Sequence, residues 1–431
     1  MTKEPIGQRT PKIRRDKNKV DRHALLGWFL VGLGMLGHCA LHIAIYNRIN
    51  ATGLRRSILK LLKYCFLATW VFIPVAMLTS EGDFFRSLAA GSWRWEAIPL
   101  SLGVYFSLTL LTLLGLGPDW LRSRPPLHAE MLAIKPQTKR HDLRRHADPP
   151  MAHSLKCRLL HRLPLNQIFL LDVEEKAIPV ENLPSQLEEL RIAHLSDVHL
   201  TGHVSPAFYR YALERAMEWK PDLIALTGDI VDRESCLPWL ATSFAAASAP
   251  LGCYFVLGNH DLRVRDPRRV RTELESLGWT DLGGRVLPRA VAGVPIEIIG
   301  NEAPWFPPPE LPKRGGSHRP SGPMCDPFRL LLSHSPDQIR WARQRGVGLM
   351  LAGHTHGGQG RLPWIGPVLS PSHYGSRYAS GTFFLQPTTM HVTRGLSGVH
   401  LLRIHCPPEL ALLRLVRAAS PGGPSSVARD D

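Results

Sequence analysis

The sequence predicts an α/β domain that follows an α-helical membrane region, and three observations support this. Three long apolar stretches lie within the first 116 residues. From residue 169 on, short apolar runs typical of strands alternate with amphipathic stretches typical of helices, which is the pattern of α/β folds. Several of these apolar runs end in groups of Asp, Asn and His, which indicates a binding or catalytic site at the ends of the strands.

The basic charge of the chain lies almost entirely in its N-terminal part. The whole chain has a net charge of +16, but residues 1–168 contain 25 Lys and Arg against 10 Asp and Glu, whereas residues 169–431 contain 27 against 26. A nucleic-acid binder is expected to carry its positive charge on the functional domain. Basic residues that flank apolar spans instead fit attraction to anionic lipids. We therefore expect a membrane, and no nucleic acid, as a partner.

Three stretches approach the ~20 apolar residues that an α-helix needs to cross a bilayer. They are residues 24–46, 61–80 and 97–116, and the last runs into a Gly117-Pro118-Asp119-Trp120 sequence that suits a membrane interface. None of the three has the short apolar core and small-residue cleavage site of a signal peptide. We therefore predict about three transmembrane helices in residues 1–117, and a multi-pass membrane protein.

The side of the membrane on which the C-terminal part lies stays open. The basic residues before the first span favour a cytoplasmic N-terminus, and three spans would then place the C-terminal domain outside. Arg48, Arg55 and Arg56 after the first span, with Arg122 and Arg124 after the third, favour the opposite orientation. Because the two counts are nearly equal, the sequence does not select between them.

The rest of the chain divides into a linker, a domain and a tail. Residues 118–168 are basic and rich in His and Pro, so we expect a linker next to the membrane. The domain should occupy residues 169–417, and the Pro/Gly/Ser-rich residues 418–431 should be disordered. Predicted strands are 191–195, 222–227, 253–257, 329–333, 347–352, 382–385, 390–393, 399–404 and 410–415, and predicted helices are 206–219 and 337–345.

Polar clusters follow five of the predicted strands. They are Ser196-Asp197-Val198-His199, Gly228-Asp229-Ile230-Val231-Asp232, Gly258-Asn259-His260-Asp261, Ser333-His334-Ser335-Pro336 and Gly353-His354-Thr355-His356-Gly357. Open α/β sheets bind ligands beyond the carboxyl ends of their strands, so the five clusters should converge on one site. Carboxylate, amide and imidazole ligands suit Mn²⁺, Fe or Zn²⁺, and the lack of thiolate argues against a structural zinc.

In order and spacing, these motifs resemble the calcineurin-like metallophosphoesterase superfamily. The signature D-x-H, G-D-x-x-D, G-N-H-D, a lone His and G-H-T-H is complete over about residues 190–357. The stretches 332–337, 353–363, 392–396 and 406–409 are similar to the YkuE-type branch, whose members are often anchored at bacterial membranes or exported across them. The resemblance implies a four-layer α/β sandwich, in which two packed β-sheets are flanked by helices.

The resemblance also implies a role for each residue of the motifs. Asp197, His199 and His356 would bind one divalent ion, Asn259, His334 and His354 a second, and Asp229 would bridge both. The ions would be Mn, Fe, Zn or Mg. His260 would be catalytic without binding metal, and Asp232 would orient it.

This set of residues predicts hydrolysis of phosphate esters. Two metal ions ~3.5–4 Å apart lower the pKa of a shared water and bind the phosphoryl oxygens, so that hydroxide can attack the phosphorus. His260 can then protonate the leaving oxygen. We therefore predict a membrane-anchored phosphoesterase for phosphodiester, pyrophosphate or phosphomonoester bonds. The resemblance and the membrane anchoring together imply a lipid-linked substrate such as UDP-2,3-diacylglucosamine. The alternative is a non-catalytic membrane scaffold that retains the fold.

Several residues near the motifs have simpler interpretations. Asp232 and Asp261 are placed where Asp often caps a helix. His38 and His42 lie four apart in the first span, and packed neutral histidines are favoured there over an intramembrane site. Arg263, Arg265, Arg361 and Arg394 are as well explained by a solvated surface as by a contact with phosphate.

Two further segments bear on the substrate. Phosphoprotein phosphatases of the superfamily show G-D-x-x-D-R-G and G-N-H-E, whereas here Arg233 is followed by Glu234 and Asp261 stands in place of Glu, which argues against a protein substrate. Residues 301–309 contain Trp305, Phe306 and three consecutive prolines. They predict either a lid or lipid-contacting loop over the site, or an ordinary surface insertion.

Overall fold

The structure is a computed structural model that describes residues 17–125, 127–145, 150–313 and 326–418. The chain divides into two compact units, residues 1–45 with 56–119, and residues 46–55 with 120–431. The predicted disordered tail lies outside the described residues from residue 419 on, as do residues 314–325 of the Pro/Gly-rich run. The predicted boundaries at residues 117, 168 and 417 stay predictions.

The first unit is helical. Its elements are α1 (Lys17–Asn50), α2 (Arg56–Ser80), α3 (Gly82–Ala89), the 3-10 turn η1 (Trp95–Ala97) and α4 (Leu100–Arg122), of which α1 and α4 extend into the second unit. Residues Arg22–Asn50 of α1, together with α2 and α4, are long and apolar enough to cross a membrane. The third span was predicted to end near residue 116, but α4 continues through Pro118 to Arg122. Proline is tolerated inside helices of this apolar kind.

The two histidines of the first span pair with neighbouring polar atoms. His38 Nε2 lies 3.0 Å from the carbonyl of Trp70, and His42 Nδ1 lies 3.0 Å from the carbonyl of His38. His42 Nε2 lies 3.4 Å from the hydroxyl of Thr69. Both rings are buried, and three of their four nitrogens have these polar partners, which agrees with packed histidines.

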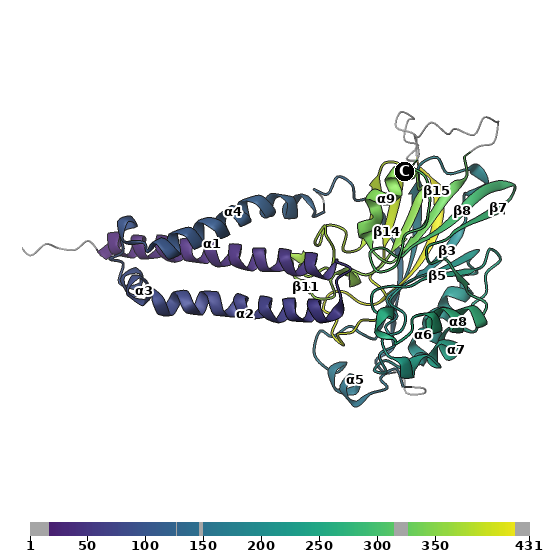
Figure 1. Ribbon diagram of the computed structural model, residues 1–431, viewed down its shortest axis with the longest axis horizontal. Helices are drawn as coiled ribbons and strands as arrows, with labels where there is room; N and C mark the ends of the chain where they lie inside the picture. Colours follow the sequence, from purple (N-terminus) through teal and green to yellow (C-terminus); the bar gives the residue numbers. More distant parts are fainter. Residues whose placement is uncertain (1–16, 126, 146–149, 314–325, 419–431) are drawn as a thin grey trace, which may run out of the picture. The chain divides into compact units, whose positions relative to one another are not determined.

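The second unit contains two mixed sheets (Figure 1). The seven-stranded sheet has the order β1 (Gln137–Asp142), β2 (Leu170–Val180), β15 (Glu409–Arg417), β3 (Arg191–Leu195), β4 (Leu223–Thr227), β5 (Cys253–Val256) and β6 (Thr280–Asp281). The six-stranded sheet has the order β13 (Gly381–Leu385), β14 (Thr388–Val392), β10 (Leu349–Ala352), β9 (Phe328–Ser333), β8 (Val294–Asn301) and β7 (Val286–Val291). A two-stranded ribbon joins β11 (Arg361–Leu362) to β12 (Gly366–Pro367).

Successive side chains of a strand point to opposite faces of its sheet, so each sheet packs against the other sheet on one face and against helices on the other. In β4, Leu223 and Ala225 belong to the core shared by the two sheets, whereas Ile224 and Leu226 pack toward the helices on the other face. Those helices are α6 (Pro206–Glu218), α7 (Trp239–Phe244) and α8 (Arg268–Ser276). On the outer face of the six-stranded sheet, α9 (Ile339–Gln344) packs against Leu331 and Met350. The prediction of a four-layer α/β fold that follows apolar helices in the sequence is confirmed.

The structure differs from the sequence prediction in several strands, because β2, β6, β7 and β8 were not predicted and two further segments behave otherwise than expected. Residues 399–404 form no strand apart from a single bridge at Ile404, because the buried guanidinium of Arg403 binds the carbonyls of Arg394, Ser397 and Cys406 there. Conversely, β1 lies inside the predicted linker and pairs with β2 along its whole length. Its side chains are mostly exposed, so no apolar alternation marks it.

Candidate metal centre

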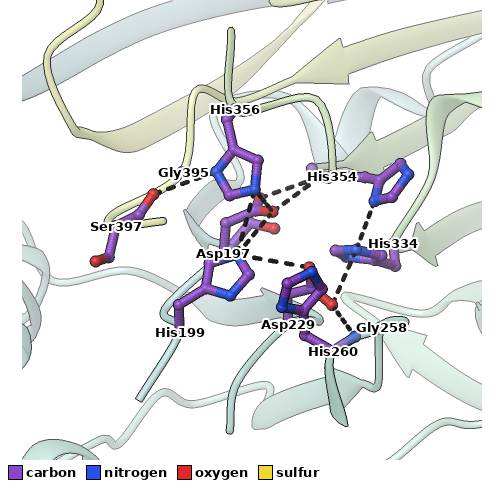
Figure 2. Close-up of polar contacts among 12 residues, drawn as sticks. Asp197, His199, Asp229, Gly258, His260, His334, His354, His356, Gly395 and Ser397 are labelled. Atoms are coloured by element: carbon purple, nitrogen blue, oxygen red, sulfur yellow. Dashed lines mark hydrogen bonds and ion pairs between the residues drawn. The ribbon is translucent and has the colours of Figure 1, made fainter. Parts of the chain in front are cut away.

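The five polar motifs meet at one edge of the two packed sheets. They follow β3, β4, β5, β9 and β10, and within each sheet these strands run parallel. Their carboxyl ends therefore point to the same side. The side chains of Asp197, His199, Asp229, His334 and His354 are buried, whereas Asn259, His260 and His356 are partly exposed (Figure 2). The structure thus brings together all nine predicted site residues.

The first group of candidate ligands contains Asp197, His199, Asp229 and His356. Nε2 of His199 lies 3.2 Å from Nε2 of His356 and 3.5 Å from Oδ2 of Asp229. Nε2 of His356 lies 3.5 Å from Oδ1 of Asp197. One ligand atom from each residue thus faces a common point (Figure 2).

The second group contains Asp229, His334 and His354. Nε2 of His334 lies 3.3 Å from Oδ1 of Asp229 and 3.1 Å from Nδ1 of His354. Asp229 therefore faces the first group with one oxygen and the second with the other, which suits a bridging ligand. Asn259 Oδ1 is buried with no hydrogen-bond partner among the described residues. An amide oxygen without a donor fits a metal ligand.

The hydrogen bonds of the rings leave lone pairs facing one another. Nδ1 of His334 donates to the carbonyl of Thr227 at 2.7 Å, and Nδ1 of His356 donates to the carbonyl of Ser397 at 3.2 Å. A carbonyl can only accept, so in the neutral rings the Nε2 atoms carry lone pairs. Burial lowers the pKa of His354 and of His356, which favours their neutral form. A cation between such nitrogens would turn the repulsion of the lone pairs into coordination.

The carboxylates favour a positive charge at the same points. Burial alone would lower the pKa of His199, but Asp232, Asp229 and Asp197 raise it. Burial likewise opposes the charge on His334, yet Asp229 raises its pKa to about 9. The same field that holds a proton on these rings would stabilise a divalent ion in its place. The donor set therefore fits a pair of divalent metal ions.

Five of the candidate ligands have a strained backbone. Asp197, His199, Asp229, His354 and His356 have φ values of 53°, 50°, 54°, 70° and 51°. Side chains other than glycine rarely adopt this left-handed region, at a cost of about 1–3 kcal/mol each. Such strain persists only where the surrounding structure imposes it, and it gathers at functional sites. The motif loops are thus held in the conformation that aims their side chains at the centre.

Asp232 connects the metal centre to the predicted catalytic histidine. Its Oδ1 lies 2.6 Å from Nδ1 of His260, and its Oδ2 lies 2.8 Å from Nδ1 of His199. Burial opposes the charged form, but His199 and His260 hold the pKa of Asp232 well below its usual range. The contact with His260 agrees with the predicted orienting role, whereas the link to His199 was not predicted.

Arg263 is a residue of the site that sequence reasoning left out. Its guanidinium contacts Asp232 and lies 3.1 Å from Nε2 of His260. A guanidinium only donates, so His260 Nε2 accepts in this arrangement. The 3-10 turn η4 (Asp261–Arg263) brings Arg263 back over His260, and this spacing of three residues was the available signal.

Asp261 is neither a ligand nor a helix cap. It is buried, and its carboxylate accepts hydrogen bonds from the backbone amides of Ile230, Val231 and Gly258 at 2.8–3.0 Å. It therefore ties two motif loops together. Burial and the nearby Asp229 raise the pKa of Asp261 to about 7.

Trp305 forms one wall of the centre. Its ring centroid lies 4.9 Å from that of His354 and 5.4 Å from that of His334. The segment 301–309 thus passes beside the second ligand group, which favours the prediction of a covering loop over that of a remote insertion. The aromatic side chain adds an apolar surface next to polar ligands.

The other arginines singled out in the sequence lie elsewhere. Arg265 is exposed. Arg394 pairs with Glu174 at 2.8 Å and with Asp172 at 3.2 Å. Arg361 donates to the carbonyl of Gly357 in η6 (His356–Gly358). No contact joins them to the candidate ligands among the described residues.

We expect Gly395→Ala to disturb the centre more than a glycine replacement elsewhere. Gly395 has φ 72°, and a Cβ there would lie 2.5 Å from Cβ of Asp197. Gly278 has φ 85° with open space around it, so Gly278→Ala carries only the backbone cost of about 1 kcal/mol. Crowding should cost a further 1–3 kcal/mol or so at Gly395. Thermal unfolding and bound metal measure the difference, and equal melting temperatures with equal metal content would contradict it.

Comparisons with known proteins agree with this site. The sequence profile described as "Calcineurin-like phosphoesterase" matches residues 190–358. The phosphodiesterase YaeI of Escherichia coli is 31% identical over 233 residues, covering 52% of this chain and 82% of the relative. The uncharacterized metallophosphoesterase YkuE of Bacillus subtilis is 29% identical, covering 57% and 86%. The UDP-2,3-diacylglucosamine pyrophosphatase LpxG of Chlamydia muridarum is 26% identical, covering 53% and 84%.

Proposed function

The chain belongs to the calcineurin-like phosphoesterase family and is a metal-dependent phosphoesterase, and on this premise we propose that it binds two divalent ions and cleaves a phosphodiester or pyrophosphate bond at a membrane surface. The observation that carries this proposal is that two pairs of histidine ring nitrogens face each other, one pair on each side of Asp229. His199 and His356 supply one pair, at 3.2 Å, and His334 and His354 supply the other, at 3.1 Å.

The proposed ligands follow the two groups. Asp197, His199 and His356 would hold one ion, Asn259, His334 and His354 the other, and Asp229 both. When bound, two such ions lower the pKa of a water and stabilise charge on the phosphoryl oxygens. Manganese, iron, zinc and magnesium all suit carboxylate, amide and imidazole ligands to some degree, so the identity of the ions is a matter for measurement.

The protein's own residues act on the leaving group. His260 Nδ1–H is held by Asp232 at 2.6 Å, which fixes the ring and partly offsets the lowering of its pKa by burial. Once Arg263 turns from His260 Nε2 to the phosphoryl group, Nε2 can take up a proton and pass it to the leaving oxygen. Arg263, which already approaches His260 Nε2, presents donors that suit a phosphoryl oxygen. His260 and Arg263 together would neutralise the charge that develops as the ester bond breaks.

A lipid-linked substrate is supported by two features of the chain. Three helices are long and apolar enough to cross a membrane, which would hold the enzyme at a lipid surface. Trp305 gives the second ligand group an apolar neighbour. The relative LpxG is named for hydrolysis of UDP-2,3-diacylglucosamine, and we take that compound as the first lipid to test.

The test uses the full-length chain in neutral detergent with manganese. We expect it to release nitrophenol from bis(p-nitrophenyl) phosphate faster than from the monoester, and EDTA to reduce the rate to background until metal is returned. Release of UMP from UDP-2,3-diacylglucosamine in mixed micelles tests the lipid. Two bound ions with no hydrolysis of any of the three compounds would contradict the enzymatic proposal and favour a scaffold. Hydrolysis of diesters without UMP release would remove only the proposed lipid.

A further inference from the structure

A cavity of about 270 Å³ lies within the second unit, separate from the metal centre. Its wall comes from the segment after α4, from the turn before β13, and from β2 and β15. None of the seven proposed metal ligands lines it. Its connection to the centre runs through Arg361, whose Nε donates at 2.8 Å to the carbonyl of Gly357, the residue after His356. The cavity is therefore distinct from the metal centre and is linked to η6 by Arg361.

Five basic side chains line this cavity among the described residues, and three of them are paired. Lys176 and Arg394 each lie 2.8 Å from Glu174, and Arg377 lies 3.0 Å from Glu130. Arg124 and Arg361 have no carboxylate within ion-pair distance in the described part of the chain. These two guanidiniums leave the wall with an excess of positive charge.

The contacts of these two arginines are all with neutral groups. Arg124 Nη2 donates to the carbonyl of Pro367 at 2.8 Å and to the hydroxyl of Ser376 at 3.1 Å. Arg361 donates to Gly357 and to the hydroxyl of Ser380. Burial, with the charge of Arg361, lowers the pKa of Arg124 to about 10. Two like charges held together in this way favour an anion between them.

Three buried nitrogens at the cavity have no hydrogen-bond partner among the described residues. They are Nε of Arg124 and both ring nitrogens of His128. His128 is only 5% exposed, and the nearest carboxylate oxygen, on Glu130, is 3.6 Å from its Nε2. Leaving a buried donor unpaired costs about 1–3 kcal/mol. A ligand with several acceptor oxygens would satisfy Nε of Arg124 and the one ring nitrogen of His128 that carries a proton, since burial lowers the pKa of His128 and favours its neutral ring.

From this geometry we propose that the cavity is a second anion site that binds one phosphate group, and that the phosphate belongs to a lipid headgroup. Arginine pairs are well suited to phosphate oxygens. Met131, Ile134 and Phe383 make part of the wall apolar, as the glycerol and first acyl carbons of a lipid require. Arg124 follows the end of α4, a candidate membrane span, by two residues. A residue so near the end of a span would meet the phosphates of lipid headgroups, which favours them as the anion. Hydrolysis at the metal centre plays no part in this binding.

The experiment measures binding to full-length protein in neutral detergent after EDTA has removed the metals. Calorimetry with inorganic phosphate, dihexanoyl phosphatidylglycerol and dihexanoylglycerol separates the phosphate from the acyl chains. We expect the first two to bind and the third not to bind. Arg124→Gln should weaken both by at least about tenfold, because it removes a charge-assisted pair. Arg289→Gln, which removes an exposed arginine from β7, is the matched control and should bind as the natural protein does.

The outcomes separate the anion from its source. Displacement of phosphate by phosphatidylglycerol supports the lipid headgroup. Phosphate that phosphatidylglycerol does not displace would overturn the lipid as the source, and equal binding by Arg124→Gln would overturn the site itself. Arg361→Gln carries the same prediction should Arg124→Gln unfold. Because binding is measured on metal-free protein without turnover, failure of this proposal and failure of the phosphoesterase proposal give different results.

Discussion

Replacing Asp229 with alanine is expected to remove both metal ions and, with them, hydrolysis of every substrate. One carboxylate oxygen of Asp229 lies 3.5 Å from His199 Nε2, and the other lies 3.3 Å from His334 Nε2, so a single side chain serves both groups. Asp197 lies in the first group only, so Asp197→Ala should lose one ion. Metal analysis of purified protein should therefore give zero, one and two ions for Asp229→Ala, Asp197→Ala and the natural protein.

The control for Asp229→Ala is an aspartate outside the centre. Asp266 is exposed, and its carboxylate accepts only from the backbone of Arg268 among the described residues. Asp266→Ala should keep two ions and full activity. Two ions retained by a folded but inactive Asp229→Ala protein would show that the bridging assignment is wrong.

His260→Ala is expected to keep both ions and to lower kcat about 10²–10⁴-fold, the usual contribution of a general acid. His260 belongs to neither of the two proposed ligand groups; it clusters with His199 and Asp232, and Asp232 still holds His199 when the His260 ring is removed. Metal content and kcat, measured on the same preparation, test the two halves of this expectation. His373→Ala removes an exposed histidine and should change neither quantity.

The leaving group distinguishes proton donation by His260 from a merely structural role. Nitrophenolate leaves readily without a proton, whereas an alkoxide does not. The loss of rate in His260→Ala should therefore be larger for a methyl or alkyl ester than for the nitrophenyl ester. An equal loss for both would contradict proton transfer and favour stabilisation of charge by position alone.

The fold could be predicted where sequence patterns reflect burial. β3, β4, β5, β9 and β10 are short apolar runs followed by polar motifs, and each was predicted within two residues. β1 could not be, because its side chains are exposed and only pairing with β2 makes it a strand. In β2, the buried charges of Asp172, Glu174 and Lys176 are held in ion pairs, Lys176 with Glu174 and Asp172 with Arg140, so the expected apolar face is missing.

The site was predictable to the extent that its residues sit in contiguous motifs. Trp305 and Arg403 reach the centre from segments with no motif of their own, Trp305 by its ring and Arg403 by binding the Ser397 carbonyl that receives His356. Such contacts depend on how distant loops fold back, which no local spacing encodes. Arg263 was within reach of local reasoning, since a single 3-10 turn carries it to His260.

The position of β15 has a consequence for how the protein is made. This strand, the last in the described chain, lies between β2 and β3 and forms parallel pairs with one and antiparallel pairs with the other. While a ribosome is still adding residues before Glu409, the seven-stranded sheet is split, and β3 has no neighbour on that side to fix Asp197. The apolar helices emerge first and can enter a membrane hundreds of residues earlier. The nascent chain would thus reach a lipid surface before its candidate metal ligands are all in place.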